Sequence, residues 1–191
     1  MVPDAFLNPD PLAARAPRAR GAVYVAGAVA LLLAASLAAA PLAVTGIDFA
    51  PAVNAKWREY GKPEAATLRK TIRAAVAGQN ECSGLPEGVA VNVTVEDLAP
   101  TRPTRQQSLD NPSLDVVRSK SLGGAELKGE LLDGQQHVLT TVSYRYFAPT
   151  LYEGSVSLDP WADAQLAIDG LARKLAAACR NLPQNGRAST G

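Results

Sequence analysis

Few residues in this chain have the types and spacing that catalysis needs. His137 is the only histidine, and a general base needs a positioned partner that the neighbouring sequence does not supply. Ser83 precedes Gly84 but lies outside the Gly-x-Ser-x-Gly pattern that presents a hydrolase nucleophile. Glu96 and Asp97 are adjacent carboxylates, which an extended strand directs to opposite faces. The sequence therefore predicts a protein that is not an enzyme and that uses no metal and no cofactor.

The two cysteines, Cys82 and Cys179, predict a structural role. They are too few for a Cys/His zinc site, and they lack the Cys-x-x-Cys spacing of a redox-active pair. Cys82 follows an expected helix, and Cys179 lies in the last turn of another. The two helix ends approach each other if both helices cover the same face of a sheet. We expect a disulfide bond, with a buried pair of unlinked thiols as the alternative.

A long polar segment, residues 99–121, is the best candidate for contact with a partner. Three prolines interrupt it, and it shows no apolar periodicity. Loops of this length are often either functional or mobile, and the sequence leaves both possibilities open. Its basic residues are the candidate partner-binding side chains: Arg102, Arg105, Arg118 and Lys120.

The elements that position these residues follow from periodicity and turn chemistry. Apolar residues at helical spacing predict helices at 53–60 and 63–77 and a long third helix with Asp159 as its N-cap. Alternation of apolar and polar residues predicts three strands, at 89–96, 124–132 and 137–147. Asp133-Gly134 is a strong turn signal, which makes the last two strands a hairpin. We expect the packed face of the last strand to consist of Val138, Val142, Tyr144 and Tyr146. The predicted fold is α+β: a small antiparallel sheet with two helices on one face, preceded by one N-terminal hydrophobic helix.

The N-terminal region predicts passage through a membrane. Residues 1–20, expected to be disordered and cytoplasmic, end in Arg15, Arg18 and Arg20, and an uncharged run over 21–47 follows. Its length favours an uncleaved signal anchor. A cleavable signal peptide is the alternative, with processing sites at Ser36-Leu37-Ala38 or Val44-Thr45-Gly46. A buried alanine-rich core helix is a third interpretation. In the first two, the arginines keep the N-terminus cytoplasmic and the domain is periplasmic.

The expected exported domain spans 48–182, and a polar tail follows at 183–191. The whole chain has 19 Lys+Arg and 18 Asp+Glu. Three arginines and two aspartates precede Asp48, so the remainder has 16 residues of each sign. Binding to nucleic acid usually requires a concentrated basic surface, so this balance argues against nucleic acid as a partner.

Three segments resemble a family of small, uncharacterised bacterial envelope proteins, mostly lipoproteins. They are VNVTVEDL at 91–98, GGAELKGELLDG at 123–134 and WADAQLAIDGLA at 161–172, and the likeness covers about residues 64–180. Members of the family usually carry a lipid-attachment cysteine at the end of the signal peptide. The first cysteine here is Cys82, far downstream, so lipidation is not supported. The family has no established activity, and it implies an envelope location alone.

These patterns predict a non-enzymatic protein of the cell envelope. We expect a single-pass protein of the inner membrane, or a periplasmic protein if the N-terminal segment is removed. Its expected partners are other envelope proteins and, through 21–47, the membrane. The alternative function is an accessory subunit of an export or transport complex that docks through the membrane segment.

Overall fold

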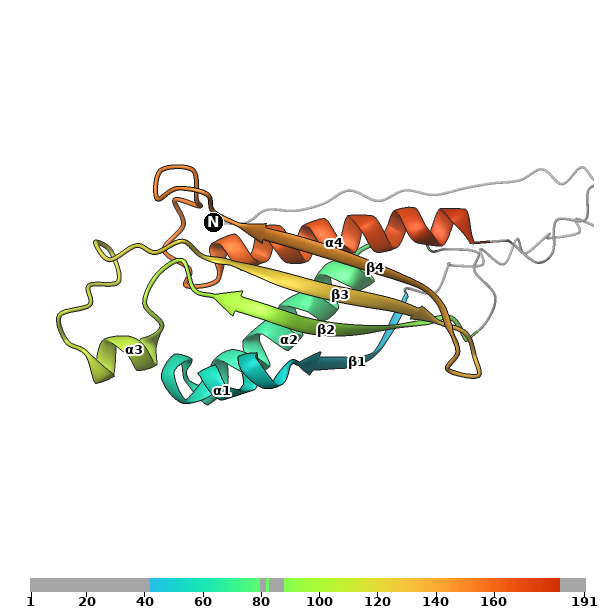
Figure 1. Cartoon of the computed structure of the whole chain (residues 1–191), viewed down its shortest axis with the longest axis horizontal. Helices are drawn as coiled ribbons and strands as arrows, with labels where there is room; N and C mark the ends of the chain where they lie inside the picture. Colours follow the sequence, from blue (N-terminus) through green and yellow to red (C-terminus); the bar gives the residue numbers. More distant parts are fainter. Residues whose placement is uncertain (1–41, 80–81, 83–87, 183–191) are drawn as a thin grey trace, which may run out of the picture. The chain divides into compact units, whose positions relative to one another are not determined.

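The computed structural model describes residues 42–79, 82 and 88–182 of the chain (Figure 1). In these residues the elements are β1 (Ala43–Phe49), α1 (Pro51–Tyr60), α2 (Lys62–Ala77), β2 (Ala90–Ala99), α3 (Arg105–Asp110), β3 (Gly124–Leu132), β4 (Val138–Phe147) and α4 (Ala162–Asn181). The expected segment 1–20, the hydrophobic run as far as residue 41 and the tail 183–191 lie outside the described residues. Within the described ranges, no helix is long and apolar enough to cross a membrane.

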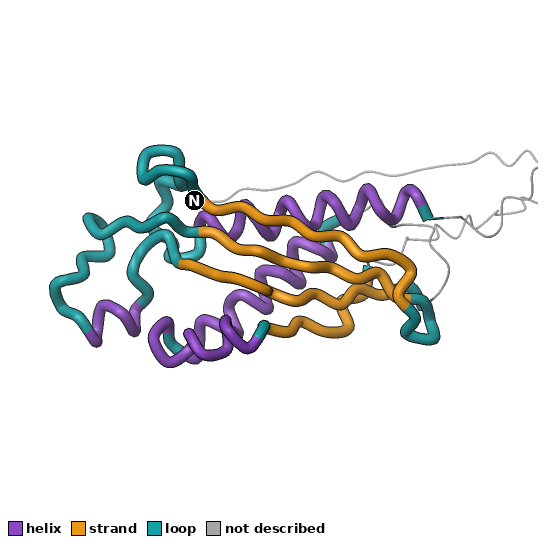
Figure 2. The backbone as a smooth tube through the Cα atoms, viewed as in Figure 1, coloured by secondary structure: helices purple, strands orange, loops and turns teal. Residues whose placement is uncertain are grey.

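The four strands form one sheet in the order β1-β2-β3-β4 (Figure 2). β3 is antiparallel to both β2 and β4, as predicted, but β1 pairs with β2 in parallel. The sheet is therefore mixed, and the prediction of an antiparallel sheet is wrong for its first strand. The physical reason is the crossover: α1 and α2 return the chain to the starting end of β1 before β2 begins, and parallel neighbours need a connection of this kind.

β1 begins inside the stretch 21–47, which was predicted to be the hydrophobic membrane segment. Ala43 pairs with Ala90, and the pairing continues to Phe49 opposite Val95. Ile47 and Phe49 are buried in the core, while Asp48 between them is exposed. Residues 43–47 therefore belong to the sheet, and Ile47 is the one buried residue among them.

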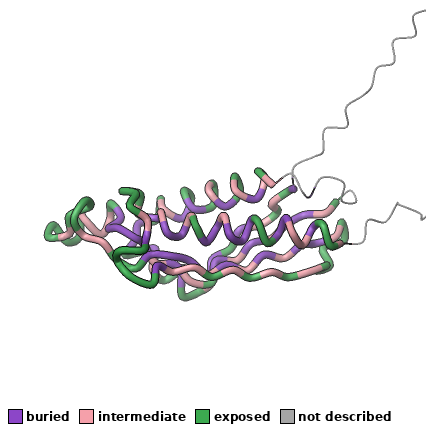
Figure 3. The backbone as a smooth tube through the Cα atoms, turned by 90° about the horizontal axis from the view of Figure 1, so that it is seen from above, coloured by how far each residue is buried: buried purple, intermediate pink, exposed green. Residues whose placement is uncertain are grey.

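Helices α2 and α4 pack on one face of the sheet, as expected (Figure 3). The buried stripe of α2 includes Leu68, Ile72 and Val76, and α4 buries a longer one. α4 approaches β4 most closely at Gly170, where a Cβ atom would overlap the ring of Tyr144. Glycine weakens a helix interior by about 1 kcal/mol relative to alanine, so its position here reflects the close approach of the strand.

A cluster of four aromatic rings fixes the start of α4 against α1. Trp57 lies edge-on to Phe49, with ring centroids 4.9 Å apart, and to Tyr60 at 6.2 Å. Trp161, directly before α4, contacts the rings of both Trp57 and Tyr60. Edge-to-face pairs of this kind add about 0.5–1.5 kcal/mol each beyond the area they bury. The cluster thereby joins β1 and α1, which are consecutive in the chain, to the start of α4, which lies far from both in the sequence.

The predicted hairpin is present, and its turn has a specific cap. One carboxylate oxygen of Asp133 accepts the backbone N–H groups of Gln135 and His137, at 2.8 and 2.9 Å. The packed face of β4 contains Val142, Tyr144 and Tyr146, as predicted. Val138 is exposed instead, because the register shifts between Leu131 and Leu132 and interrupts the alternation of β4 near its start.

Candidate functional site

Two long connections meet at one end of the sheet. The segment 100–123 joins β2 to β3, and the segment 148–160 joins β4 to α4. Backbone hydrogen bonds link them, from Thr101 N–H to the carbonyl of Pro160 at 2.7 Å and from Ala148 N–H to the carbonyl of Gly123 at 2.9 Å. We call these two segments together the loop platform.

The first segment is more ordered than the prediction of an irregular loop over 99–121. β2 extends to Ala99, and α3 is a short helix that begins after Thr104. Thr104 and Gln107 form a reciprocal capping box, in which each side chain bonds to the backbone of the other residue. The Gln107 side chain also donates to Glu59 of α1 at 2.7 Å. The first turn of α3 is therefore fixed internally by the capping box and is joined to α1 through Gln107.

Two of the four candidate basic residues stabilise the platform through hydrogen bonds to its backbone carbonyls. Arg102 is 8% exposed, and its guanidinium donates to the carbonyls of Ser157, Val116 and Val117. Lys120 donates to the carbonyls of Leu151 and Gly154, at 2.7 and 3.2 Å. Arg102 and Lys120 therefore each join the first segment of the platform to the second, and Arg102 also binds two carbonyls of its own segment. Arg105 and Arg118 are exposed, and neither makes an ion pair within the described residues.

A buried polar pair lies beneath the platform. The Thr101 hydroxyl donates to one carboxylate oxygen of Asp163 at 2.9 Å, and the other oxygen accepts the N–H of Ser155 at 2.6 Å. Both Thr101 and Asp163 are fully buried. Gly123 packs against them so closely that any side chain there would overlap Thr101. The pair ties both segments to the first turn of α4.

The outer surface of the platform is apolar to an unusual degree. Tyr152 is 97% exposed and Val156 is 88% exposed, although both are large apolar side chains. Further exposed apolar side chains lie on the same two segments: Leu109, Val116, Val117, Leu122, Leu151 and Leu158. Single exposed apolar residues are normal, whereas a large contiguous apolar patch is typical of an interaction site, so the platform is the candidate surface for contact with a partner.

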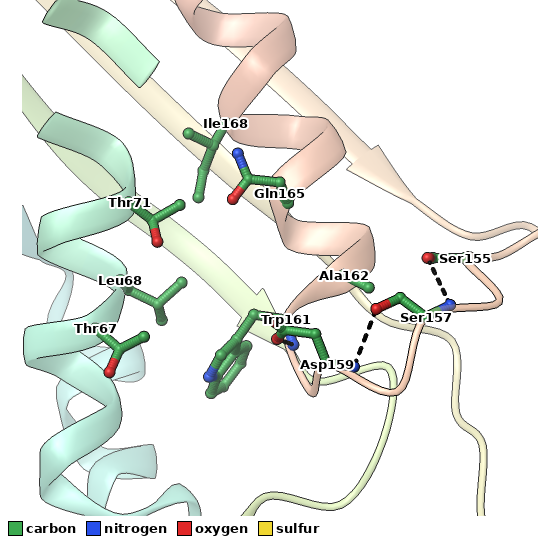
Figure 4. A pocket seen from close by; sticks show the side chains of 10 residues that line it. All are labelled: Thr67, Leu68, Thr71, Ser155, Ser157, Asp159, Trp161, Ala162, Gln165 and Ile168. Atoms are coloured by element: carbon green, nitrogen blue, oxygen red, sulfur yellow. Dashed lines mark hydrogen bonds between the residues drawn. The ribbon is translucent and has the colours of Figure 1, made fainter. Parts of the chain in front are cut away.

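A small pocket opens beside the platform, between α2 and α4 (Figure 4). Its volume is about 270 Å³. Its floor is apolar, and its rim carries hydroxyl, carboxylate and amide groups; the lining residues are Thr67, Leu68, Thr71, Ser155, Ser157, Asp159, Trp161, Ala162, Gln165 and Ile168. Small-molecule sites usually have volumes of about 300–1,000 Å³, so this pocket suits one side chain or an equally small group.

Trp161 in the pocket is bonded to two carboxylates. Its indole N–H donates to Glu64 of α2 at 2.7 Å, and its backbone N–H donates to Asp159 at 2.7 Å. The prediction of Asp159 as the N-cap of α4 is wrong by two residues, because Pro160 and Trp161 form a turn before the helix begins. The N–H of Asp163 in the first turn is satisfied by Thr101 from another part of the chain, at 3.1 Å.

The residues first considered for chemistry lie apart from this site. His137 is exposed in the β3–β4 turn, with its ring nitrogen 3.2 Å from Asp133. Glu96 is exposed, and a bulge in β2 separates it from the regular alternation. A carboxylate oxygen of Asp97 instead accepts a hydrogen bond from the ammonium of Lys56 at 2.9 Å. Within the part of the chain that the structure describes, no group of three His, Cys, Asp or Glu side chains could hold a metal ion.

The predicted disulfide is confirmed. Cys82 and Cys179 are bonded, with their Cα atoms 5.2 Å apart and a sequence separation of 97. Both side chains are buried. The bond joins the chain that follows α2 to the last turns of α4, and α2 and α4 lie on the same sheet face, as the prediction required.

Comparisons with known proteins add no relative: the chain matches no family model, no curated protein and no solved structure. The resemblance to the envelope family stays a prediction. The geometry described above is therefore the basis for the function proposed below.

Proposed function

We propose that this chain is a non-enzymatic module of the cell envelope that binds another envelope protein through the loop platform. The observation that carries the proposal is the contrast between the two sides of the platform. Its outer side exposes Tyr152 and Val156, whereas its inner side is held by Arg102, Lys120 and the Thr101–Asp163 pair. Loops that are fixed before binding lose less conformational entropy when a partner docks.

The direction of β1 supports partner binding through the platform in a protein that is anchored by its N-terminal segment. β1 and β2 run in parallel, and Ala43 pairs with Ala90 at the start of both strands. The platform begins after Ala99, at the other end of β2. Ten residues of strand span about 30 Å at roughly 3.3 Å per residue. The start of β1, where the N-terminal segment joins the described domain, therefore lies about one strand length from the platform.

The disulfide supports the proposed compartment. Disulfide bonds persist in oxidising environments such as the periplasm, and they are rare in the cytosol. A bond between Cys82 and Cys179 fits the location that the three arginines before residue 21 predict.

Site-specific photo-cross-linking in cells tests the proposal. A photoreactive amino acid at Val156 should capture a reproducible partner protein, because this side chain is exposed on the platform. The matched control is the same residue at Thr141, which is exposed on β4 away from the platform. Capture of no protein at Val156, or of the same proteins at both positions, would contradict the proposal.

A second experiment separates this function from that of an accessory subunit that docks through the membrane. Residues 1–41 are replaced by an unrelated cleavable signal peptide, which keeps all of β1 in the exported domain. Survival of the Val156 cross-link supports binding through the platform. Loss of the cross-link, with export and folding intact, supports docking through the membrane segment.

A further inference from the structure

We propose that the pocket between α2 and α4 receives a lysine or arginine side chain of the protein that binds the loop platform. This inference rests on the proposed function, and it names the chemistry of the partner's anchor. It follows from the shape of the pocket, the sign of its charges and its position beside exposed platform residues.

The floor of the pocket suits an aliphatic stem. Leu68 of α2 and Ile168 of α4 lie on opposite sides of it, and Trp161 lies at one end (Figure 4). All three side chains are buried in the domain, so they form a fixed apolar wall. Lysine and arginine bury their methylene stems on surfaces of this kind while the charged head reaches polar groups.

The charges around the pocket favour a cation. Asp159 lines it, and one of its carboxylate oxygens accepts the backbone N–H of Trp161. Among the described hydrogen bonds, none engages its other oxygen. Glu64 is held at the edge of the indole ring of Trp161. Within the described ranges, no lysine or arginine lines the pocket.

Neutral acceptors complete the rim. The side chain of Gln165 donates its N–H to Asp169, which leaves its carbonyl oxygen as an acceptor. The hydroxyl groups of Ser155, Ser157 and Thr71 can accept further hydrogen bonds. A guanidinium has five N–H donors and an ammonium has three, so the rim matches a donor-rich head. An anionic group would instead face the carboxylate of Asp159, with no cation among the described lining residues to compensate.

The position of the pocket connects it to the platform. Ser155 and Ser157 line the pocket, and Val156 between them is 88% exposed. A partner that covers Val156 therefore contacts the chain directly between two residues of the pocket lining. Protein interfaces commonly concentrate their binding energy in a few anchors that fill pockets beside larger apolar contacts, and arginine is enriched among these anchors.

Binding of capped peptides to the full-length protein in detergent tests the inference. The probe is acetyl-Ala-Ala-Arg-Ala-Ala-amide, and its matched control contains citrulline, which has nearly the same shape without the charge. The readout is the NMR signal of the Trp161 indole N–H, which donates to Glu64 beside the pocket. The backbone amide signal of Thr141, which is exposed on β4 away from the platform, is the internal reference.

The arginine peptide should shift the Trp161 signal in a saturable way and bind about tenfold more tightly than the citrulline peptide. Asp159→Asn should weaken binding by about the same factor, whereas Asp110→Asn on α3 should not change it. Equal binding of the two peptides, no shift of Trp161 with either, or wild-type affinity in Asp159→Asn would each overturn the inference.

Free arginine distinguishes a protein anchor from a small-molecule ligand. If free arginine binds as tightly as the peptide, the pocket takes a metabolite and the inference about the partner is wrong. The outcome of the Val156 cross-link is independent of these titrations. The platform proposal can therefore survive the failure of the pocket inference, and the two failures can be told apart.

Discussion

The hydroxyl of Thr101 and a carboxylate oxygen of Asp163 lie 2.9 Å apart, although 62 residues separate them in the sequence. The same hydroxyl accepts the backbone N–H of Asp163 at 3.1 Å. Thr101 therefore acts as a helix cap from outside the helix, since it satisfies one of the free N–H groups of the first turn of α4. Because Asp163 also holds Ser155, this pair couples the start of α4 to both segments of the loop platform.

Thr101→Val should destabilise the protein by about 2 kcal/mol. The substitution keeps the shape of the side chain but removes the hydroxyl, which leaves a buried carboxylate oxygen and a buried N–H without their partner. The measurement is the free energy of unfolding from urea titration. Thr141→Val, at an exposed position on β4, is the control and should change stability by less than about 0.5 kcal/mol. Equal stability of the two variants would show that the pair contributes little.

Gly170→Ala should also destabilise the protein, although alanine is the better helix former. Helix propensity alone would stabilise the variant by about 1 kcal/mol. The added Cβ, however, overlaps the ring of Tyr144 on β4, and overpacking of a core costs about 1–3 kcal/mol. The packing effect should dominate. In a Tyr144→Val background the same substitution should become nearly neutral or stabilising, and a double-mutant cycle measures this coupling.

Reduction of the Cys82–Cys179 bond should lower the stability substantially. The bond closes a loop over a sequence separation of 97, for which the chain-entropy model gives about 4.7 kcal/mol. The expected result is a lower midpoint of urea unfolding after reduction and alkylation. Cys82→Ser/Cys179→Ser should reproduce this loss without reductant. Intact mass of the native protein, alkylated with and without prior reduction, should show that both thiols are protected.

The extent of β1 predicts where the N-terminal segment can be removed. Cleavage after Gly46 would delete Ala43 and Val44 from the parallel pairing with β2 and leave a fragment of the edge strand. Cleavage after Ala38 would leave the whole strand in place. We therefore expect the mature protein, if it is processed, to begin before Leu42. N-terminal sequencing of protein from its native envelope is the measurement, and a start at Ile47 would contradict the role of β1 in the sheet.

The elements with strong local signals could be predicted from the sequence. The stripe of α2, the alternation of β3 and the Asp133-Gly134 turn each depend on residues close together in the chain, and the structure confirms all three. β1 could not be predicted, because an apolar strand at the end of a hydrophobic run has the same composition as the run itself. Its identity depends on pairing with β2, more than forty residues later.

The candidate site was predictable only in its location. The length and polarity of the segment 99–121 pointed to the platform, but the roles of its cations depend on contacts with a second loop. Arg102 and Arg105 are indistinguishable in the sequence, yet one is buried against the carbonyl of Ser157 and the other is exposed. Asp163 was not singled out from the sequence. Its helical neighbours Ala164 and Ala167 are buried, and an acid on a buried helix face needs a polar partner, which here is Thr101.

The ion pair between Lys56 and Asp97 makes a pH-dependent contribution to stability. Partial burial alone would raise the pKa of Asp97, but hydrogen bonds from the Lys56 ammonium and the Leu98 N–H outweigh it and hold the pKa below its ordinary value of 3.8. Because the pKa is lower in the folded state, the carboxylate stabilises the protein above pH 3.8, and this contribution is lost as the pH falls through the folded value. Lys56 also donates to the carbonyl of Leu98, so its position does not depend on Asp97 alone.

Asp97→Asn should therefore cost about 0.5 kcal/mol near neutral pH, the magnitude typical of a partly exposed ion pair. The difference between wild type and variant should shrink as the pH falls from 3.8 through the lower folded pKa of Asp97, because below that folded pKa both side chains are uncharged. Urea unfolding at a series of pH values measures this difference. Lys56→Met removes one of the groups that lower the pKa of Asp97, beside the Leu98 N–H and the Arg145 charge, so in that background Asp97→Asn should have a smaller effect at neutral pH. A difference that stays constant from neutral to acid pH would show that the charge of Asp97 does not contribute to folding.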